Sequence, residues 1–592
     1  MAFIQALSPD LLLQIVSHLR SEDHLAPSPE DLLTVSALAR VCRRFSEPAL
    51  DMLWGHLPSI VPLIFTMPRD LWVIEPREEK GGCRTLVKFT RPLLSRDYAR
   101  FLGYACRVKA LHDTSHWRGI ALDESAWTAL EQFRPTPHLL PRLRSLSLTV
   151  NCSVALVPIH ILISSVLKQL TVYVRRSSGR GAHLRRGLRR LFEKLHVTNP
   201  PIRHISLEFN HCSRPKYQTL LTALLCLKSL TTVQTSYTPV GASTLAILSH
   251  LPHLRDLQVR VLGSGQHTVD AFARMRSTRP FRSLAKVSYT VDDMAVVHCL
   301  LRSAASRSLT YIDICMLADV SPEDAQEFMS IVALHHSGLE HLQLRLRDPM
   351  PRDPNDPHEV APDQETLPSD ILGPLLALPQ LSTVNMASCP IVVNDSLVAR
   401  MAIAWPDIST LELCSSFHGF DDLGVRPPAH VRLAGLVPLF EGCKKLQRLG
   451  LPLDTTMTTA PDSADSTGCD TSARPSACPT IPRLADLCVG WSKIEEADVA
   501  PVASFLSDHL PLLSKVTDGW ESAFVYEVVA DEHTEGAWTY EMRWRQVAAL
   551  VRGLSLVRQQ ERNWARRMRE VLPVPAAAPA MEDPQGMDEY LP

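Results

Sequence analysis

Long apolar runs are missing from this sequence. No window reaches the roughly 18 consecutive apolar residues that a membrane-spanning helix requires. The leucine-rich start is interrupted by Asp10, and no Lys or Arg precedes Arg20, so it lacks the basic region and the unbroken apolar stretch of a secretion signal. We therefore expect the first residues to be folded structure, and we expect no membrane among the partners of the chain.

An excess of charge of one sign is missing as well. The 592 residues include 61 Lys and Arg and 63 Asp and Glu, a formal net charge of -2. Nucleic-acid-binding domains usually carry a marked basic excess, so the composition disfavours nucleic acid as a partner. The most basic segment, residues 174–196, is predicted to be an amphipathic helix with a solvated basic face. A nuclear localisation signal or an RNA-binding patch around Arg185 to Arg190 is the alternative.

Motifs for catalysis and for metal binding are also absent. The 14 cysteines include no C-x-x-C pair, which argues against a zinc ribbon or a dense disulfide framework and favours reduced thiols in the cytoplasm or nucleus. The sequence has no G-x-S-x-G elbow, no H-E-x-x-H helix and no phosphate-binding Gly-Lys-Ser/Thr. His335, His336 and His341 cluster, but no Cys or carboxylate pattern completes a metal site. We expect a non-enzymatic protein without metal or cofactor.

The first 54 residues do contain a clear helical pattern. Ser8 can cap a first helix and Pro9 can occupy its first position, since the N–H that proline lacks would be unpaired there anyway. Apolar residues then follow at helical spacing. A polar break separates this helix from a second one, whose apolar positions include Leu33, Leu38, Val41, Cys42 and Phe45. A third segment ends at Leu53 and Trp54.

These helices resemble the F-box, the small module that docks on the Skp-type adaptor of a cullin-based ubiquitin ligase. The resemblance is carried by "LSPDLLLQIVSHL" (7–19), by "DLLTVSALARVCRRF" (31–45) and by the Leu53–Trp54 pair. It implies that an adaptor, and through it a cullin scaffold, is a partner. The residues it assigns to adaptor binding are Pro9, Leu12, Ile15, Leu19, Leu33, Val41 and Cys42. The alternative is that these helices are a plain N-terminal cap with internally buried leucines.

The rest of the chain repeats a Leu-x-x-Leu-x-Leu-like unit. Its anchor residues, mostly about 25 to 40 residues apart, are Leu146, Leu257, Val287, Ile312, Leu342, Val384, Leu411, Leu449 and Leu487. Amphipathic helices are predicted between the units, for example in residues 241–250, 294–306, 322–337 and 368–378. The pattern predicts an α/β fold, an irregular leucine-rich-repeat solenoid shaped like a horseshoe. Arg144, Asp256, Gln343 and Glu412 are expected on its concave surface, where a target protein would bind.

These features predict the following domain organisation. A helical F-box-like module (1–55) is followed by a connector that caps the solenoid (56–105) and by the solenoid itself (106–540). Disordered inserts are expected near 348–369 and 454–480, with a capping helix at 541–572 and a disordered tail at 573–592. "FTRPL" (89–93) and "DYARFLGYA" (97–105), with the repeats, resemble large fungal F-box proteins with degenerate leucine-rich repeats.

The resemblance implies a substrate-recognition subunit of a ubiquitin ligase, in the cytoplasm or the nucleus, that binds an unknown target protein. A repeat scaffold without any ligase connection is the alternative.

Overall fold

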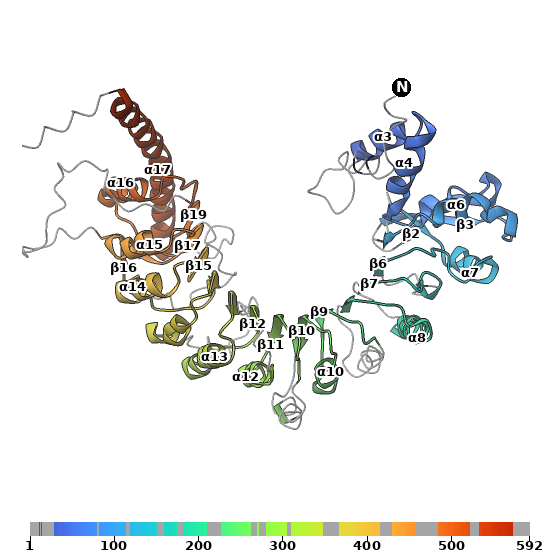
Figure 1. Cartoon of the computed structure of the whole chain (residues 1–592), viewed down its shortest axis with the longest axis horizontal. Coiled ribbons are helices and arrows are strands. Elements are labelled where there is room, and N and C mark those ends of the chain that lie inside the picture. The colour runs from blue at the N-terminus through green and yellow to red at the C-terminus, as the bar shows by residue number, and fades with distance from the viewer. Residues whose placement is uncertain are drawn as a thin grey trace, which may run out of the picture. The chain divides into compact units, whose positions relative to one another are not determined.

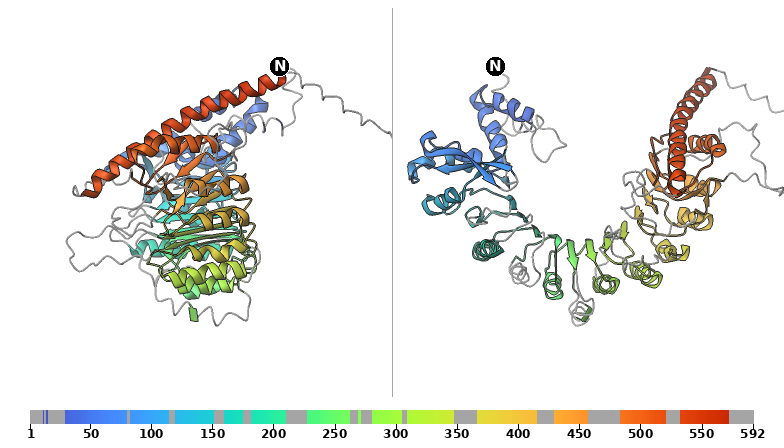
Figure 2. Two further views of the ribbon diagram at one scale, coloured as in Figure 1. Left: turned by 90° about the vertical axis from the view of Figure 1, so that its left-hand side faces the viewer. Right: turned by 180° about the vertical axis from the view of Figure 1, so that it is seen from behind.

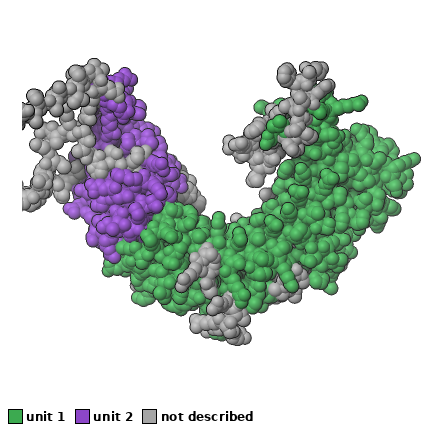
Figure 3. Space-filling model, in the orientation of Figure 1, with its two compact units in different colours: residues 1–390, 421–425 green, residues 391–420, 426–592 purple. Residues whose placement is uncertain are grey.

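The computed structural model describes most of the chain: residues 11, 14, 29–79, 82–113, 119–150, 159–174, 181–209, 227–261, 269–270, 280–304, 309–346, 366–414, 429–456, 483–520 and 532–571. The chain forms two compact units (Figure 3): unit 1 comprises residues 1–390 and 421–425, and unit 2 comprises residues 391–420 and 426–592. The inserts expected near 348–369 and 454–480 fall mostly outside the described residues, and the tail falls wholly outside them.

Unit 1 is built on a parallel sheet in which successive strands lie side by side (Figure 1). The strands, in their order across the sheet, are β1 (His56–Leu57), β4 (Ala110–Asp113), β6 (Ser145–Val150), β7 (Gln169–Val174), β8 (His204–Phe209), β9 (Thr232–Pro239), β10 (Asp256–Val261), β11 (Lys286–Val291), β12 (Tyr311–Met316), β13 (His341–Leu346) and β14 (Thr383–Asn385). This strand order follows the chain order, which is the topology of a solenoid.

The anchor residues form one continuous apolar ladder across these strands. Leu257 pairs with Val287, Val287 with Ile312, and the register continues to Leu342 and Val384. All five side chains are buried. Strand residues alternate between the two faces of a sheet, so each Leu-x-Leu unit points its apolar side chains inward. The predicted α/β class and strand–helix solenoid are confirmed.

Helices return the chain from strand to strand along the outer side of the sheet of unit 1 (Figure 1). They are α7 (Glu124–Phe133), η3 (Ile159–Ile161), α8 (Gly181–Thr198), α10 (Ala242–Leu248), α12 (Met294–Ser303), α13 (Pro322–His335) and η7 (Ser369–Ala377). Ser321 caps α13 by accepting from the backbone N–H of Asp324 at 3.1 Å. The helix predicted in residues 368–378 is a 3₁₀ helix, because Pro374 in its middle disrupts α-helical hydrogen bonding.

The N-terminal module contains two described helices, α3 (Pro29–Leu38) and α4 (Arg43–Gly55). Val35, Phe45 and Ala49 form a small buried core between them. The sequence pattern placed Leu33 to Phe45 on one helix, which is wrong: the chain is extended at Cys42, the residue that precedes α4. The two residues that directly follow the module form β1, which pairs with β4 and so joins the repeat sheet.

The connector folds as a small layer of its own. Strands β2 (Trp72–Glu79) and β3 (Gly82–Phe89) are antiparallel, and β5 (Ile120–Leu122) runs parallel to β3. Short helices flank them: α5 (Val61–Ile64), η1 (Arg69–Leu71), η2 (Ser95–Tyr98) and α6 (Ala99–Ala105). Arg91 of "FTRPL" binds Asp97 of "DYARFLGYA" through two hydrogen bonds of 2.7 and 3.0 Å, so the two motifs are held together.

Unit 2 repeats the strand–helix pattern. Its parallel strands are β15 (Thr410–Glu412), β17 (Arg448–Gly450), β19 (Asp486–Cys488) and β20 (Lys515–Thr517), with a separate pair β16 (Val431–Arg432) and β18 (Leu453–Asp454). Its helices are α14 (Asp395–Ala404), η8 (Leu433–Leu436), α15 (Val437–Gly442), η10 (Glu496–Asp498), α16 (Val499–His509) and α17 (Glu532–Val571).

The long helix α17 covers the last repeat of unit 2 (Figure 2). Its Trp544 is buried and donates from Nε1 to the carbonyl oxygen of Ser492 at 2.9 Å. Arg558 of α17 pairs with Asp508 of α16 at 2.7 Å. Among the described helices, none is long and apolar enough to cross a membrane.

Candidate interaction surfaces

The polar face of the sheet in unit 1 is built by the residues that alternate with the apolar ladder. One row of outward positions runs in register through five strands: Gln258, Ser288, Asp313, Gln343 and Asn385. A second row contains Asp256, Lys286, Tyr311, His341 and Thr383. The sequence predicted Asp256 and Gln343 on this face, and both lie in these rows. Arg144 lies directly before β6 and is exposed.

A charge pair links β12 and β13 on this face. Arg345 donates to Asp313 through several contacts, including Nη2 to Oδ2 at 2.8 Å and Nη2 to Oδ1 at 2.9 Å, and Ser288 donates to the same carboxylate at 2.9 Å. The Asp313 side chain is almost fully covered, whereas the Arg345 side chain remains 47% exposed. A guanidinium that is held in place and still half exposed is suited to binding a carboxylate on a partner.

Two further carboxylates on this face are partly removed from water. Burial raises the pKa of Asp256, and the neighbouring Lys286 and His204 oppose this effect. Burial also raises the pKa of Glu208, on β8. A carboxylate that has lost hydration gains more from a cationic partner than a fully solvated one does. The face therefore offers both a fixed cation and partly desolvated anions.

The N-terminal module presents a second surface, which is apolar. Pro9, Leu12, Ile15 and Leu19 lie outside the described residues. Leu33 on α3 is 70% exposed, and Val41 in the turn between α3 and α4 is 64% exposed. Cys42 is half-buried and packs against the small core of Val35, Phe45 and Ala49. Leu33 and Val41 therefore face solvent, whereas Cys42 packs inward. Leu32 is also exposed, and the sequence interpretation missed it.

Helix α4 is fixed to the start of the solenoid by side chains distant in sequence. Arg107 forms an ion pair with Asp51 and a second one with Glu47 at 2.6 Å. Trp54 stacks on Tyr104, with ring centroids 4.3 Å apart. The sequence interpretation missed this attachment, because no local pattern relates Arg107 to carboxylates more than 50 residues earlier.

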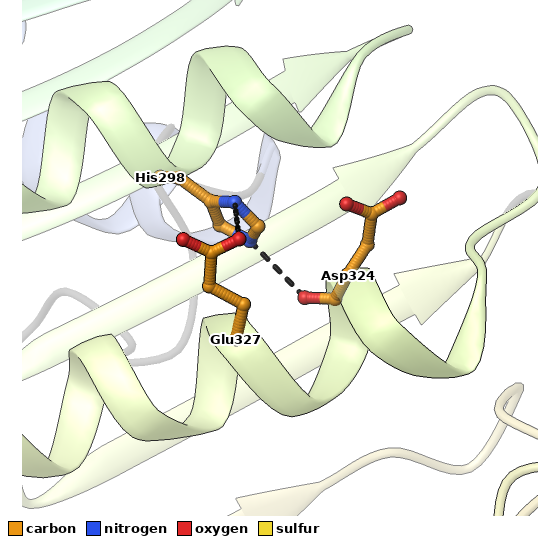
Figure 4. Close-up of side chains that lie close together, drawn as sticks. All are labelled: His298, Asp324 and Glu327. Carbon is orange, nitrogen blue, oxygen red and sulfur yellow. Dashed lines mark hydrogen bonds and ion pairs between the residues drawn. The ribbon is translucent and has the colours of Figure 1, made fainter.

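One cluster of side chains has the composition of a metal site. His298 on α12 faces Asp324 and Glu327 on α13 (Figure 4). The His298 Nε2 lies 3.1 Å from the Asp324 carbonyl oxygen, and its Nδ1 lies 3.4 Å from a carboxylate oxygen of Glu327. Glu327 also pairs with Arg302, and the Asp324 carboxylate accepts from Ser321 at 2.9 Å. The polar atoms have protein partners, so the cluster links α12 to α13.

The three histidines noted in the sequence do not join this cluster. His336 is buried, and burial lowers the pKa of its ring to about 4, which keeps the ring neutral at physiological pH. His341 lies in β13, with its ring centroid 5.9 Å from that of Tyr311. On the basic helix α8, Leu191, Phe192 and Leu195 are buried while Arg189 and Arg190 are exposed, as the amphipathic interpretation predicted.

The sequence matches no protein-family model and no curated protein. Among solved structures, it is similar to an internalin from Listeria monocytogenes (13% identity, 64% of this chain and 74% of that chain, TM-score 0.30). It is also similar to the yeast complex of Rad7 and Elc1 (12% identity, 56% of this chain and 82% of that chain, TM-score 0.29). A third similar structure is the leucine-rich-repeat protein LegL7 from Legionella pneumophila (15% identity, 48% of this chain and 85% of that chain, TM-score 0.27).

These TM-scores are all well below 0.5. The fold assignment therefore rests on the strand register and the buried ladder of this chain itself. Open solenoid faces of this kind suit macromolecules rather than small ligands, which bind in closed pockets. The chain is thus a leucine-rich-repeat solenoid, a fold used for protein interaction, with a small helical module at its N-terminal end.

Proposed function

We propose that this chain is the non-catalytic substrate receptor of a cullin-based ubiquitin ligase. In this proposal, the N-terminal module binds a Skp-type adaptor and the polar face of the solenoid binds the target protein. The observation that carries the proposal is the exposure of Leu33 and Val41 on a module whose sequence resembles the F-box. Burial of exposed apolar side chains against a partner lowers the free energy, so these residues favour association.

The attachment of the module supports the same proposal. Arg107 and the Trp54–Tyr104 stack hold α4 against α6 and the segment that leads into β4. A receptor of this kind performs no bond chemistry. It accelerates ubiquitin transfer by raising the effective concentration of the target near the charged enzyme, which requires a defined connection between its two binding surfaces.

The polar face would contribute specificity for the target. The half-exposed Arg345 would bind a carboxylate of the target, and Asp256 and Glu208 would bind its basic side chains. Charge complementarity of this kind determines which partner binds and how fast. The target segment is therefore expected to carry charges of both signs.

The test is a binding assay between the full chain and a purified Skp-type adaptor. We expect the double variant Leu33→Asp, Val41→Asp to lower affinity at least about tenfold, equivalent to about 1.4 kcal/mol, because each charge would have to be desolvated in the interface. A second variant, Leu12→Asp with Ile15→Asp, tests the preceding segment. The matched control is Leu334→Asp on α13, where the leucine is 78% exposed and far along the chain from the module.

Three outcomes decide the proposal. Binding that the module variants lose and Leu334→Asp keeps supports it, provided circular dichroism shows unchanged folding. Equal binding by all variants would mean that the adaptor does not use this module. No binding by the intact chain would favour a repeat scaffold without a ligase connection.

A further inference from the structure

Two cysteines of unit 2 lie side by side on its sheet. The Sγ of Cys414 is 3.9 Å from the Sγ of Cys488, and it is also 3.5 Å from the Cys488 carbonyl oxygen. Cys488 is the last residue of β19. Its side chain lies on the sheet face opposite to that of the buried Leu487, which we call the polar face of unit 2. Both cysteine residues are partly exposed.

A glycine in the intervening strand allows this contact. The strand β17 lies between β15 and β19, and its Gly450 is in register with both Glu412 and Cys488. The chain bends at residues 413–414, directly after β15, and Leu413 donates from its N–H to the Gly450 carbonyl oxygen at 2.8 Å. A Cβ at position 450 would lie 2.9 Å from the Cys414 carbonyl oxygen, so a larger residue would push Cys414 away.

The two thiols differ in acidity. Hydrogen bonding from Cys414 lowers the pKa of Cys488, with further hydrogen bonds from the Gly490 backbone and the Thr517 side chain, while burial and Glu412 oppose them. Burial, together with the bond to Cys488, raises the pKa of Cys414 well above its usual value. The thiolate form is therefore favoured at Cys488 and disfavoured at Cys414.

Other cysteines of the chain provide a contrast. Cys389 and Cys443 are buried, and burial raises their pKa values to about 12 and about 11. A thiolate is the reactive form of cysteine, so these two residues are expected to be inert. Cys488 differs from them in having both a stabilised thiolate and a second sulfur within reach.

We propose that Cys414 and Cys488 form a peroxide-sensitive dithiol that closes to a disulfide on the polar face of unit 2. In the first step, the Cys488 thiolate attacks one oxygen of hydrogen peroxide, the O–O bond breaks, and sulfenic acid and hydroxide are formed. In the second step, the hydroxide takes the proton of the Cys414 thiol and becomes water. The Cys414 thiolate then attacks the Cys488 sulfur and displaces hydroxide, which combines with the proton that Cys488 first released. The sum is two thiols and one peroxide giving one disulfide and two waters.

The second step requires the two sulfur atoms to move together. The sulfurs must approach from 3.9 Å to about 2.0 Å. No side chain stands between them at position 450, because that residue is glycine. The disulfide would tie the bend after β15 to β19, beside Glu412 and Arg448 on the polar face. Oxidation would thus alter a surface available to partners, whichever partner binds there.

The test is peroxide treatment of the reduced full chain, followed by alkylation, digestion and mass spectrometry. We expect a linked peptide pair containing Cys414 and Cys488, two hydrogens lighter than the reduced peptides. Before oxidation, Cys488 should alkylate at least about tenfold faster than Cys443 at neutral pH. Glu412→Gln should increase this rate further, because it removes the charge that opposes the thiolate.

Variants separate the two steps. In Cys414→Ser, the Cys488 sulfenic acid has no resolving thiol, so sulfinic acid at position 488 should accumulate. Cys443→Ser is the matched control and should leave the linked peptide unchanged. Absence of the linked peptide in the intact chain, or alkylation of Cys488 no faster than that of Cys443, would overturn the proposal without relying on any variant.

Discussion

Asp97 illustrates how a single buried charge holds the connector together. Its carboxylate accepts two hydrogen bonds from Arg91 and one from the Leu94 backbone N–H at 2.9 Å, and Arg91 also reaches Asp70 at 3.0 Å. Hydrogen bonding to Arg91 lowers the pKa of Asp97 in spite of its burial. The sequence contained both motifs, but nothing local to either one indicated that they pair.

This pair gives a prediction about pH. The folded-state pKa of Asp97 is lowered, so its contribution to stability is complete above its unfolded pKa of about 3.9 and is lost as the pH falls through the folded value. We expect Asp97→Asn to lower the free energy of unfolding by about 2 kcal/mol at pH 7. The difference from the wild type should shrink at pH 3, as measured by denaturant unfolding at both pH values.

Asp70→Asn is the appropriate control for this experiment. The Asp70 side chain is 68% exposed, so its ion pair with Arg91 is expected to contribute little. A loss of stability in Asp70→Asn as large as that in Asp97→Asn would contradict the role assigned to the buried carboxylate.

At the scale of elements, the repeated strand was the most predictable feature. Alternation in Leu-x-Leu fixes which side chains point inward, so the anchors from Leu146 to Leu487 could be identified without a structure. Elements whose form depends on contacts distant in sequence could not be predicted in this way. The antiparallel pair β2–β3, the break at Cys42 and the 3₁₀ form of η7 belong to this group.

The ladder can be tested by changing adjacent residues of one strand. Leu342 is fully buried, whereas the next residue, Gln343, belongs to the polar face. We expect Leu342→Ala to lower the free energy of unfolding by about 2–5 kcal/mol, because it leaves a cavity in the ladder. Gln343→Ala should change it by no more than about 0.5 kcal/mol. Similar effects of the two substitutions in denaturant unfolding would argue against the assigned register.

At the scale of the whole molecule, the informative contacts join residues far apart in sequence. Arg107 with Glu47 and Asp51, and Cys414 with Cys488, span 56 to 74 residues. The periodicity of apolar residues gives information only on residues that are close in sequence, so it cannot predict such pairs. The resemblance to the F-box supplied the functional hypothesis, yet it covered only the first 54 residues and said nothing about how the module is attached.

This attachment predicts a measurable change in dynamics. Removing the guanidinium in Arg107→Ala leaves Glu47 and Asp51 without their cation, so α4 should open locally more often. We expect amide hydrogen exchange in α4 to accelerate about tenfold, equivalent to about 1.4 kcal/mol. Arg100→Ala, an exposed arginine on the neighbouring helix α6, is the matched control. Unchanged exchange in Arg107→Ala would show that the aromatic stack alone fixes the helix.

The pairing of β1 with β4 has a consequence for solubility. Residues 56–57 occupy the hydrogen-bonding groups along the outer edge of β4, which would otherwise be open. Unpaired strand edges are templates for association with other chains. A shortened form that begins after residue 57 would expose this edge over Ala110 and Leu111. Residues 56–57 therefore protect this edge of the solenoid against association with other chains, independently of any partner that the N-terminal module binds.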